Sequence, residues 1–263
     1  MSRLATRRVR QFTAVIEREG DGYVSTCPEL DIVSQGETVE GARANLLEAI
    51  EGFFEVASSS DIKRRLRRET YLMTVKLTYH GHSCFSIETG GTHLLIDPFL
   101  SGNAMADVKP EQVKANYILI SHAHGDHLGD AVPIARRTGA EVISNFEIAN
   151  YMGKHHVTAH AMHIGGARVF PFGKVKLTIA HHGSSFPDGS YGGNPCGFLL
   201  WLEGKVLYFA GDTALTYDMK LYGEEGIDVA MLPIGDNFTM GPEDAVKATG
   251  FLQPKLAVLM HYN

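Results

Sequence analysis

The sequence predicts a mixed α/β (α+β) protein in which a small α+β domain precedes a larger domain of two packed sheets flanked by helices. The larger domain is predicted because strand-like runs alternate with turns and short helical patterns throughout residues 73–263. The division is predicted because all 13 histidines lie at or after His80. A polar, basic segment separates the two parts. We therefore assign residues 1–60 to the first domain, 61–72 to a linker and 73–263 to the second domain.

The first domain begins with two strand candidates, TAVIERE and GYVSTC, joined by a Gly-Asp-Gly turn at residues 20–22. Pro28 then marks a loop, and Thr38 is suited to cap a helix. Apolar residues in that helix recur at spacings of three and four, at Val39, Ala42, Leu46, Ile50 and Phe53. This segment carries no catalytic constellation.

The second domain contains many short apolar runs rich in β-branched and aromatic residues, which predict strands. Helical patterns are expected near residues 129–138, 145–152 and 242–251. The predicted strands are VKLTYH, CFSIET, HLLIDP, YILIS, KVKLTIA, GFLLWL, KVLYFAG, DVAMLPI and LAVLM.

Composition narrows the classes of function. The chain has 263 residues, 44% of them hydrophobic, and a formal net charge of −6 with acidic and basic residues interleaved. This pattern favours a soluble globular protein and disfavours nucleic acid as a partner. Three cysteines without paired or zinc-type spacing favour a reducing compartment, so we expect a cytoplasmic protein. No stretch has the length and apolar character of a membrane span or a signal peptide.

The segment SHAHGDHLGD at residues 121–130 is the strongest functional signal. It follows the buried-strand run YILIS, so its side chains are expected at the edge of a sheet. Imidazole and carboxylate together suit zinc and neighbouring first-row metals. A loop allows His122 and His124 to face one ion while Asp126 and His127 face another.

Four donors from one loop cannot complete two metal sites, and the later strand ends supply more. His181 and His182 follow LTIA, Asp212 follows VLYFAG, and His261 follows LAVLM. Each follows an apolar run, as a site built along one sheet edge requires.

Residues 73–263 contain the motifs YHGHSCF, DPFLSGN, SHAHGDHLGD, HIGG, HHGSS, AGDTAL and LPIGDNFTMGPEDA. With these motifs the segment resembles the metallo-β-lactamase superfamily, in particular its uncharacterised family of bacterial and archaeal metal-dependent hydrolases. The resemblance implies an αββα sandwich and selects His182 over His181, because the family pattern places its histidine immediately before Gly-Ser-Ser. It also implies that Asp212 bridges two ions. Members of the family usually continue through another loop and a helix after the histidine that matches His261. The implied ligands are His122, His124 and His182 for one ion, and Asp126, His127 and His261 for the other.

Two divalent ions, with zinc as the first choice and manganese or iron as alternatives, would activate water for hydrolysis. Asp126 and Asp212 are the predicted catalytic residues: Asp126 would accept the proton of the attacking water, and Asp212 would orient the ions. The expected substrate is a small ester, lactone, amide or phosphodiester. The sequence does not identify the leaving-group acid, for which His181, Tyr191 and Asp236 are candidates. It also leaves open whether His82 and His163 approach the substrate. Whether the chain forms a homo-oligomer is open as well. The segment 183–197 is expected to be an irregular loop that either borders the substrate or only connects two strands.

The first domain has its own resemblance. The segment GYVSTCPELDIVSQGETVEGARANLLEAIEGFF is similar to the N-terminal domain of HicB-type antitoxins over about residues 9–57. That resemblance implies a small RNase toxin as a partner. Two alternatives to an enzyme therefore remain: an interaction protein with a passive hydrolase domain, and a metal-binding redox or sensor protein.

Overall fold

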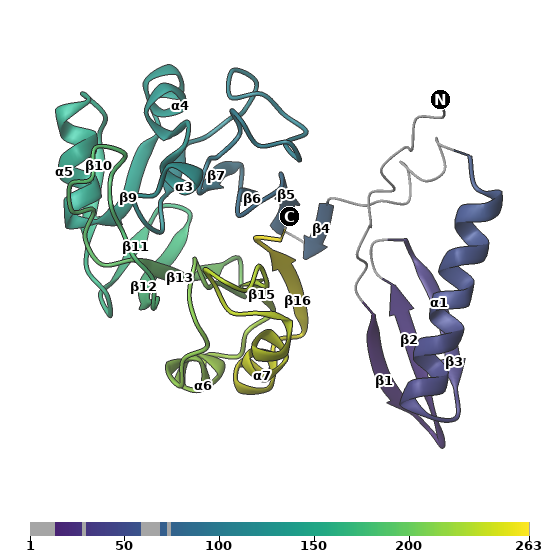
Figure 1. Cartoon of the computed structure of the whole chain (residues 1–263). Coiled ribbons are helices and arrows are strands. Elements are labelled where there is room, and N and C mark those ends of the chain that lie inside the picture. Colours follow the sequence, from purple (N-terminus) through teal and green to yellow (C-terminus); the bar gives the residue numbers. More distant parts are fainter. Residues whose placement is uncertain (1–13, 28–29, 59–68, 73–74, 263) are drawn as a thin grey trace. The chain divides into compact units, whose positions relative to one another are not determined.

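The computed structural model describes residues 14–27, 30–58, 69–72 and 75–262. The chain forms two compact units, Met1–Arg68 and Glu69–Asn263, and each is described on its own (Figure 1). The predicted loop at Pro28 and the linker prediction for residues 61–68 lie outside the described residues.

The first unit is a three-stranded antiparallel sheet covered by one helix. Thr38 caps the helix as predicted, since its Oγ1 accepts a hydrogen bond from the amide of Gly41 at 3.0 Å. Leu46 and Ile50 face the sheet and pack in one apolar cluster with Cys27. A third strand was not expected from the sequence. The elements are β1 (Val15–Glu19), β2 (Gly22–Cys27), β3 (Ile32–Gly36) and α1 (Val39–Val56).

The second unit begins with a seven-stranded sheet in the order β10-β9-β8-β7-β6-β5-β4. The linker prediction was wrong at its end: residues 69–72 form a strand that pairs antiparallel with β5 through backbone hydrogen bonds. Thr70 and Tyr71 favour that extended conformation. The strands are β4 (Glu69–Leu72), β5 (Val75–Tyr79), β6 (Phe85–Thr89), β7 (Thr92–Ile96), β8 (Tyr117–Leu119), β9 (Glu141–Asn145) and β10 (Ala159–Met162).

A six-stranded sheet in the order β11-β12-β13-β14-β15-β16 completes the unit. Its first four strands are antiparallel, and β14, β15 and β16 are parallel. The strands are β11 (Ala167–Phe170), β12 (Gly173–Ile179), β13 (Cys196–Leu202), β14 (Lys205–Phe209), β15 (Val229–Pro233) and β16 (Leu256–Met260).

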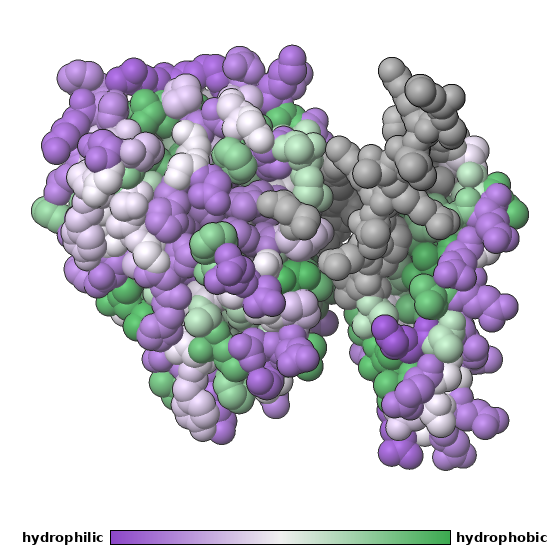
Figure 2. Space-filling model, in the orientation of Figure 1, coloured by the Kyte–Doolittle hydropathy of each residue, from purple (hydrophilic) through white to green (hydrophobic). Residues whose placement is uncertain are grey.

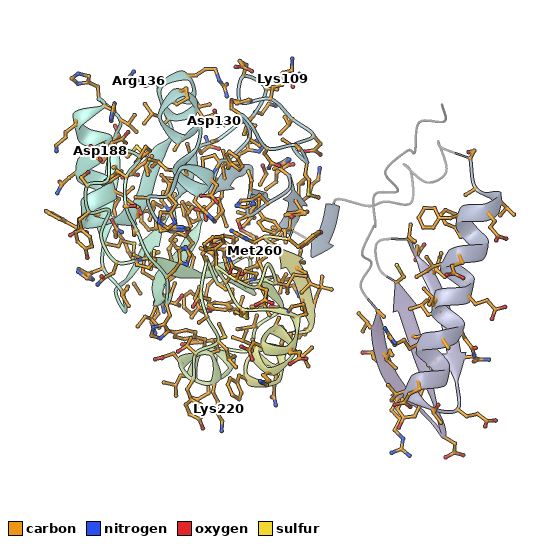
Figure 3. The ribbon with its side chains drawn as sticks, viewed as in Figure 1. Lys109, Asp130, Arg136, Asp188, Lys220 and Met260 are labelled. Carbon is orange, nitrogen blue, oxygen red and sulfur yellow. The ribbon has the colours of Figure 1, made fainter. Side chains whose placement is uncertain are left out.

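The two sheets pack face to face with helices on both outer faces, which confirms the predicted αββα sandwich. Phe85, Phe198 and Phe209 are fully buried in the layer between the sheets, together with Met260, which is labelled in Figure 3. Separate apolar clusters join each sheet to its helices. The helices are α3 (Gly125–Leu128), α4 (Ala131–Thr138) and α5 (Phe146–Lys154) over the first sheet, and α6 (Asp218–Gly223) and α7 (Pro242–Leu252) over the second.

Strand direction determines where the predicted metal ligands lie. β7, β8 and β9 are parallel, so the segments that follow them leave the first sheet at one edge. In the second sheet β12, β14 and β16 run in the same direction, because β13 is antiparallel to both β12 and β14. The residues that follow these three strands therefore also share one edge.

The surface of the second unit is mostly polar in the view of Figure 2, with separate, small hydrophobic areas. No helix in the described part of the chain is long and apolar enough to cross a membrane.

Asp228 supplies a test of stability away from the predicted site. Its carboxylate is 7% exposed, accepts a hydrogen bond from the amide of Val206 and lies 2.8 Å from Lys255 Nζ. Burial acts to raise the pKa of Asp228, but these hydrogen bonds outweigh it and lower the pKa below its ordinary value. We expect Asp228→Asn to lower the free energy of unfolding by about 1–3 kcal/mol at pH 7.

The pH dependence of this loss follows from the lowered pKa. The carboxylate makes its full contribution to the free energy of unfolding above the pKa of about 3.9 that it has in the unfolded chain. This contribution is lost as the pH falls through the lower pKa of the folded state. Urea unfolding of the wild type and of Asp228→Asn between pH 7 and pH 3.5 measures the difference between their free energies of unfolding. This difference should shrink only below about pH 4. A difference that stays constant to the lowest pH would contradict this assignment.

Candidate metal centre

Three histidines form the first cluster. His122 and His124 come from the segment after β8, and His182 follows β12. Nε2 of His122 lies 3.0 Å from Nδ1 of His124. The ring centroid of His182 lies 5.0 Å from that of His122 and 5.1 Å from that of His124. One nitrogen from each ring falls within 4.8 Å of the others, which is close enough for all three to bind a single ion.

The second cluster brings together Asp126, His127 and His261, with His82 beside them. Asp126 and His127 belong to the short helix α3, and His261 follows β16. The side chain of His127 is fully buried, whereas that of His261 is 13% exposed. The amide of His261 donates a hydrogen bond to the carbonyl of His82, which ties this end of the described chain to the β5–β6 turn.

Asp212 lies between the two clusters. Its Oδ2 is 3.0 Å from Nε2 of His261, 3.2 Å from Nε2 of His127 and 3.7 Å from Nε2 of His182. Gly211 directs the chain into this position, because its φ of 65° is in the left-handed region and a Cβ there would lie 2.6 Å from the carbonyl oxygen of Cys196. One carboxylate therefore contacts imidazoles from both clusters.

Asp97 and Ser121 fix the orientation of two imidazoles. Ser121 Oγ donates its single proton to Asp97 Oδ2 at 2.5 Å, so at 3.0 Å it accepts from Nδ1–H of His122. Asp97 Oδ2 also accepts from Nδ1–H of His127 at 2.8 Å. In both rings the proton on Nδ1 leaves the lone pair of Nε2 facing the cluster, as a metal ligand requires. Sequence reasoning missed Asp97, although its position directly after the predicted strand HLLI could have indicated it.

The electrostatics favour a cation at this position. Burial, together with the neighbouring His127, lowers the pKa of His122 well below its ordinary value, so this ring is neutral. Burial acts to raise the pKa of Asp212, but His127 and His261 outweigh it and hold the pKa well below its usual range. Burial acts to lower the pKa of His127, yet Asp212 and Asp97 outweigh it and raise the pKa. The carboxylates thus attract positive charge to the centre of the site.

Two buried atoms show that the site fits a divalent metal. Among the described residues, neither Nε2 of His127 nor Oδ1 of Asp212 has a hydrogen-bond partner, although His127 Nε2 lies 3.2 Å from the other oxygen of Asp212. A buried polar atom without a partner is energetically costly unless a bound water or ion satisfies it. The donors are imidazole nitrogens and carboxylate oxygens, which are the ligands of zinc and its first-row neighbours.

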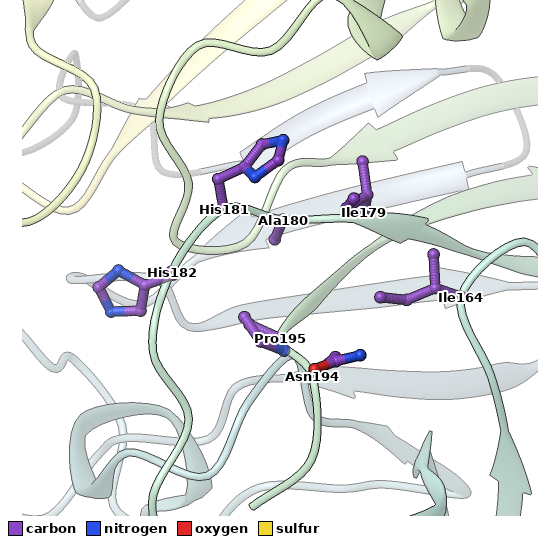
Figure 4. Close-up of a pocket in the computed structure, with 7 residues that line it drawn as sticks. All are labelled: Ile164, Ile179, Ala180, His181, His182, Asn194 and Pro195. Atoms are coloured by element: carbon purple, nitrogen blue, oxygen red, sulfur yellow. The ribbon is translucent and has the colours of Figure 1, made fainter.

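A pocket of about 380 Å³ opens beside the first cluster. Figure 4 shows the rings of His181 and His182 at one end and the side chain of Ile164 at the other. The structure thus brings His182 to His122 and His124, and places its neighbour His181 in the pocket wall. The pocket is lined by Ile164, Ile179, Ala180, His181, His182, Asn194 and Pro195.

The other candidates from sequence lie in different surroundings. Tyr191 is 64% exposed, and its hydroxyl donates to Oδ1 of Asn194, in the part of loop 183–195 that borders the pocket. His163 is exposed and accepts a hydrogen bond from the amide of Ile164. Asp236 is exposed, and no described contact joins it to the metal ligands. Of these residues, only His181 lines the pocket directly.

An αββα sandwich with a His/Asp cluster at one sheet edge is the architecture of the metallo-β-lactamase class of metal-dependent hydrolases. Residues 76–261 match the family model described as the β-lactamase superfamily domain. A metallo hydrolase from Ignicoccus hospitalis matches with a TM-score of 0.66 and 39% identity, over 72% of this chain and 83% of that chain. A structure described as a metal-dependent hydrolase from Parabacteroides distasonis matches with a TM-score of 0.60 and 26% identity, over the same two shares.

A relative from Geobacillus sp. (strain WCH70), named a UPF0173 metal-dependent hydrolase, is 55% identical over 194 residues. The alignment covers 72% of this chain and 86% of the relative. The chain belongs to the UPF0173 metal-dependent hydrolase family of the metallo-β-lactamase superfamily. It is therefore a metal-dependent hydrolase, as predicted from the sequence.

Proposed function

We propose that this chain uses two divalent ions, most readily Zn²⁺, to hydrolyse small uncharged esters or lactones. The observation that carries the two-ion proposal is the position of Asp212, whose Oδ2 contacts imidazoles from both donor clusters. His122, His124 and His182 would hold one ion, and Asp126, His127 and His261 the other. Divalent ions in such a site polarise a carbonyl oxygen and lower the pKa of a nearby water towards about 7.

The protein's own residues supply orientation and proton transfer. Asp97 and Ser121 hold the lone pairs of His122 and His127 towards the centre. Burial acts to raise the pKa of Asp126, but a hydrogen bond from His82 acts in the opposite direction, and the pKa lies below its ordinary value. Asp126 is therefore ionised, and its 42% exposed side chain is accessible to accept a proton from the attacking water.

The pocket supports the substrate class. Its apolar wall consists of Ile164, Ile179, Ala180 and Pro195, and neither lysine nor arginine is among the described residues that line it. A charged group attached to the scissile bond would lose its hydration there without gaining a partner. A short apolar acyl or ring substituent fits, so neutral esters and lactones are favoured over amides, whose N–H requires a partner, and over phosphodiesters.

The test compares the metal-loaded wild type with Ile179→Glu on short-chain aryl esters, γ-lactones and an aryl phosphodiester. We expect ester or lactone hydrolysis by the wild type. In the variant KM should rise roughly tenfold or more, because a charge replaces apolar contact with the substrate. Val169→Glu on the exposed strand β11 is the matched control, since Val169 is 74% exposed and does not line the pocket.

The substrate proposal would be contradicted if the phosphodiester were the better substrate, or if Ile179→Glu left KM for esters unchanged while the metal content stayed at the wild-type level. The two alternatives from sequence, a redox or sensor protein and an interaction protein with a passive hydrolase domain, gain no support from the comparisons or the structure. The HicB-like resemblance of the first unit and its implied RNase partner stay predictions.

A further inference from the structure

His82 occupies an unusual place in the turn between β5 and β6. Its φ is 56°, in the left-handed region that costs energy for a residue with a side chain. The preceding residue, Gly81, has a φ of 95°, and a Cβ there would lie 2.6 Å from Cβ of Met105. This turn therefore places the imidazole of His82 in one defined position, where its side chain is 8% exposed.

The side chain of His82 contacts the second cluster. Its Nε2 lies 3.1 Å from Oδ2 of Asp126, which is hydrogen-bond distance. Its ring centroid is 4.2 Å from that of His261 and 5.4 Å from that of His127. The rings of His82 and Phe99 pack edge to face with their centroids 5.5 Å apart, so His82 has an aromatic neighbour besides the histidines.

The backbone of His82 makes a separate connection. Its carbonyl oxygen accepts hydrogen bonds from the amide of His261 at 2.8 Å and from the hydroxyl of Tyr79 at 3.0 Å. Asp126 lies in helix α3, which follows β8 of the first sheet, and His261 follows β16 of the second sheet, so most of the second unit's sequence separates them. His82 is bonded to Asp126 by its side chain and to His261 by its backbone.

We propose that His82 is a positioning residue for the second metal site. Its Nε2–H donates to Asp126, and its carbonyl and ring hold His261 beside Asp126. The proposal rests on the two-ion function proposed above. Carboxylate ligands need such hydrogen bonds to fix their orientation, and loss of a partner of this kind typically weakens metal binding by about 10–100-fold. Both His82 and His261 have positive φ values, 56° and 53°, so neither backbone position is one that the local sequence favours without the contact.

The experiment measures metal binding by equilibrium dialysis of the full chain against Zn²⁺, with ions counted per chain. His82→Phe keeps a ring for packing and removes the donor, whereas His82→Gln keeps an N–H donor near the position of Nε2. We expect the wild type and His82→Gln to bind about two ions, and His82→Phe to keep the first ion while its second binds about 10–100-fold more weakly. His156→Phe is the control, because His156 has the same φ of 56° but is exposed and distant in sequence from every ligand.

The outcomes separate the possible failures. A wild-type chain that binds only one ion overturns the two-ion function and this inference with it. If the wild type binds two ions and His82→Phe binds both equally tightly, only the positioning role of His82 is overturned. If His82→Gln loses the second ion as His82→Phe does, His82 is a direct ligand and the positioning role is again overturned. Thermal unfolding of the metal-free proteins verifies that each variant folds.

Discussion

Asp212→Asn should lower kcat/KM for the best ester or lactone substrate by roughly 10³-fold, because several kcal/mol of charge stabilisation would depend on the ions that Asp212 is proposed to hold. Its Oδ2 lies within 3.7 Å of Nε2 of His127, His182 and His261, so this single carboxylate contacts both donor clusters. Asparagine preserves the size of the side chain but removes the negative charge. Its amide also turns an N–H towards atoms that should face a cation.

Steady-state kinetics and metal analysis of the same protein sample check this expectation. Asp228→Asn is the matched control. Asp228 is also a buried carboxylate, directly before β15 of the second sheet, but it bonds to lysines instead of histidines. That control should lose stability and keep its metal content and kcat. If Asp212→Asn retained near wild-type activity with full metal content, Asp212 would have no bridging role.

Asp126→Ala should abolish detectable hydrolysis and lower the metal content from about two ions per chain to about one. Asp126 belongs to the second cluster only, so the histidine cluster that contains His122 and His182 keeps all three of its donors. The side chain is 42% exposed, so we expect the metal-free variant to fold, and thermal unfolding of the metal-free protein verifies this. The loss of activity would therefore reflect the site and not misfolding.

Elemental analysis after dialysis and a hydrolase assay measure the two parts of this prediction. Asp188→Ala is a suitable control, because Asp188 lies in the loop that borders the pocket and hydrogen-bonds only to Ser190 among the described contacts. Two ions in Asp126→Ala would show that Asp126 is no ligand. Full activity with one ion would show that the second site is not needed for hydrolysis.

Much of the site could be predicted because its donors follow apolar strand runs. His122, Asp212 and His261 each come directly after a run that the structure confirms as a strand. Strands that run in one direction end at one edge, so donors far apart in sequence meet there. The choice between His181 and His182 could not be made from spacing, since adjacent residues have almost the same sequence environment. It depended on the family pattern.

Asp97 and His82, which contact the proposed metal ligands, could not be predicted in the same way. Asp97 precedes a proline, and an aspartate in that setting is typical of a turn. Its role depends on contacts with Ser121 and His127, which lie 24 and 30 residues further along the chain. His82 poses the same difficulty, because its partner Asp126 is 44 residues away.

Besides β4, two further strands of the first sheet, β9 and β10, were missed. β10 has the sequence AHAM, which has few β-branched or aromatic residues, and β9 has the sequence EVISN, which leads directly into helix α5. Both strands form by parallel pairing with neighbours that are distant in sequence. Tertiary packing therefore determines their conformation more than local propensity does.

The central claim is that two ions bind between Asp212 and the six residues His122, His124, His182, Asp126, His127 and His261. Anomalous diffraction from crystals of the chain grown with Zn²⁺, recorded on both sides of the zinc absorption edge, tests it most directly. Two peaks are expected, with Asp212 between them and three of the six residues around each. A single peak, or two peaks without Asp212 between them, would contradict it.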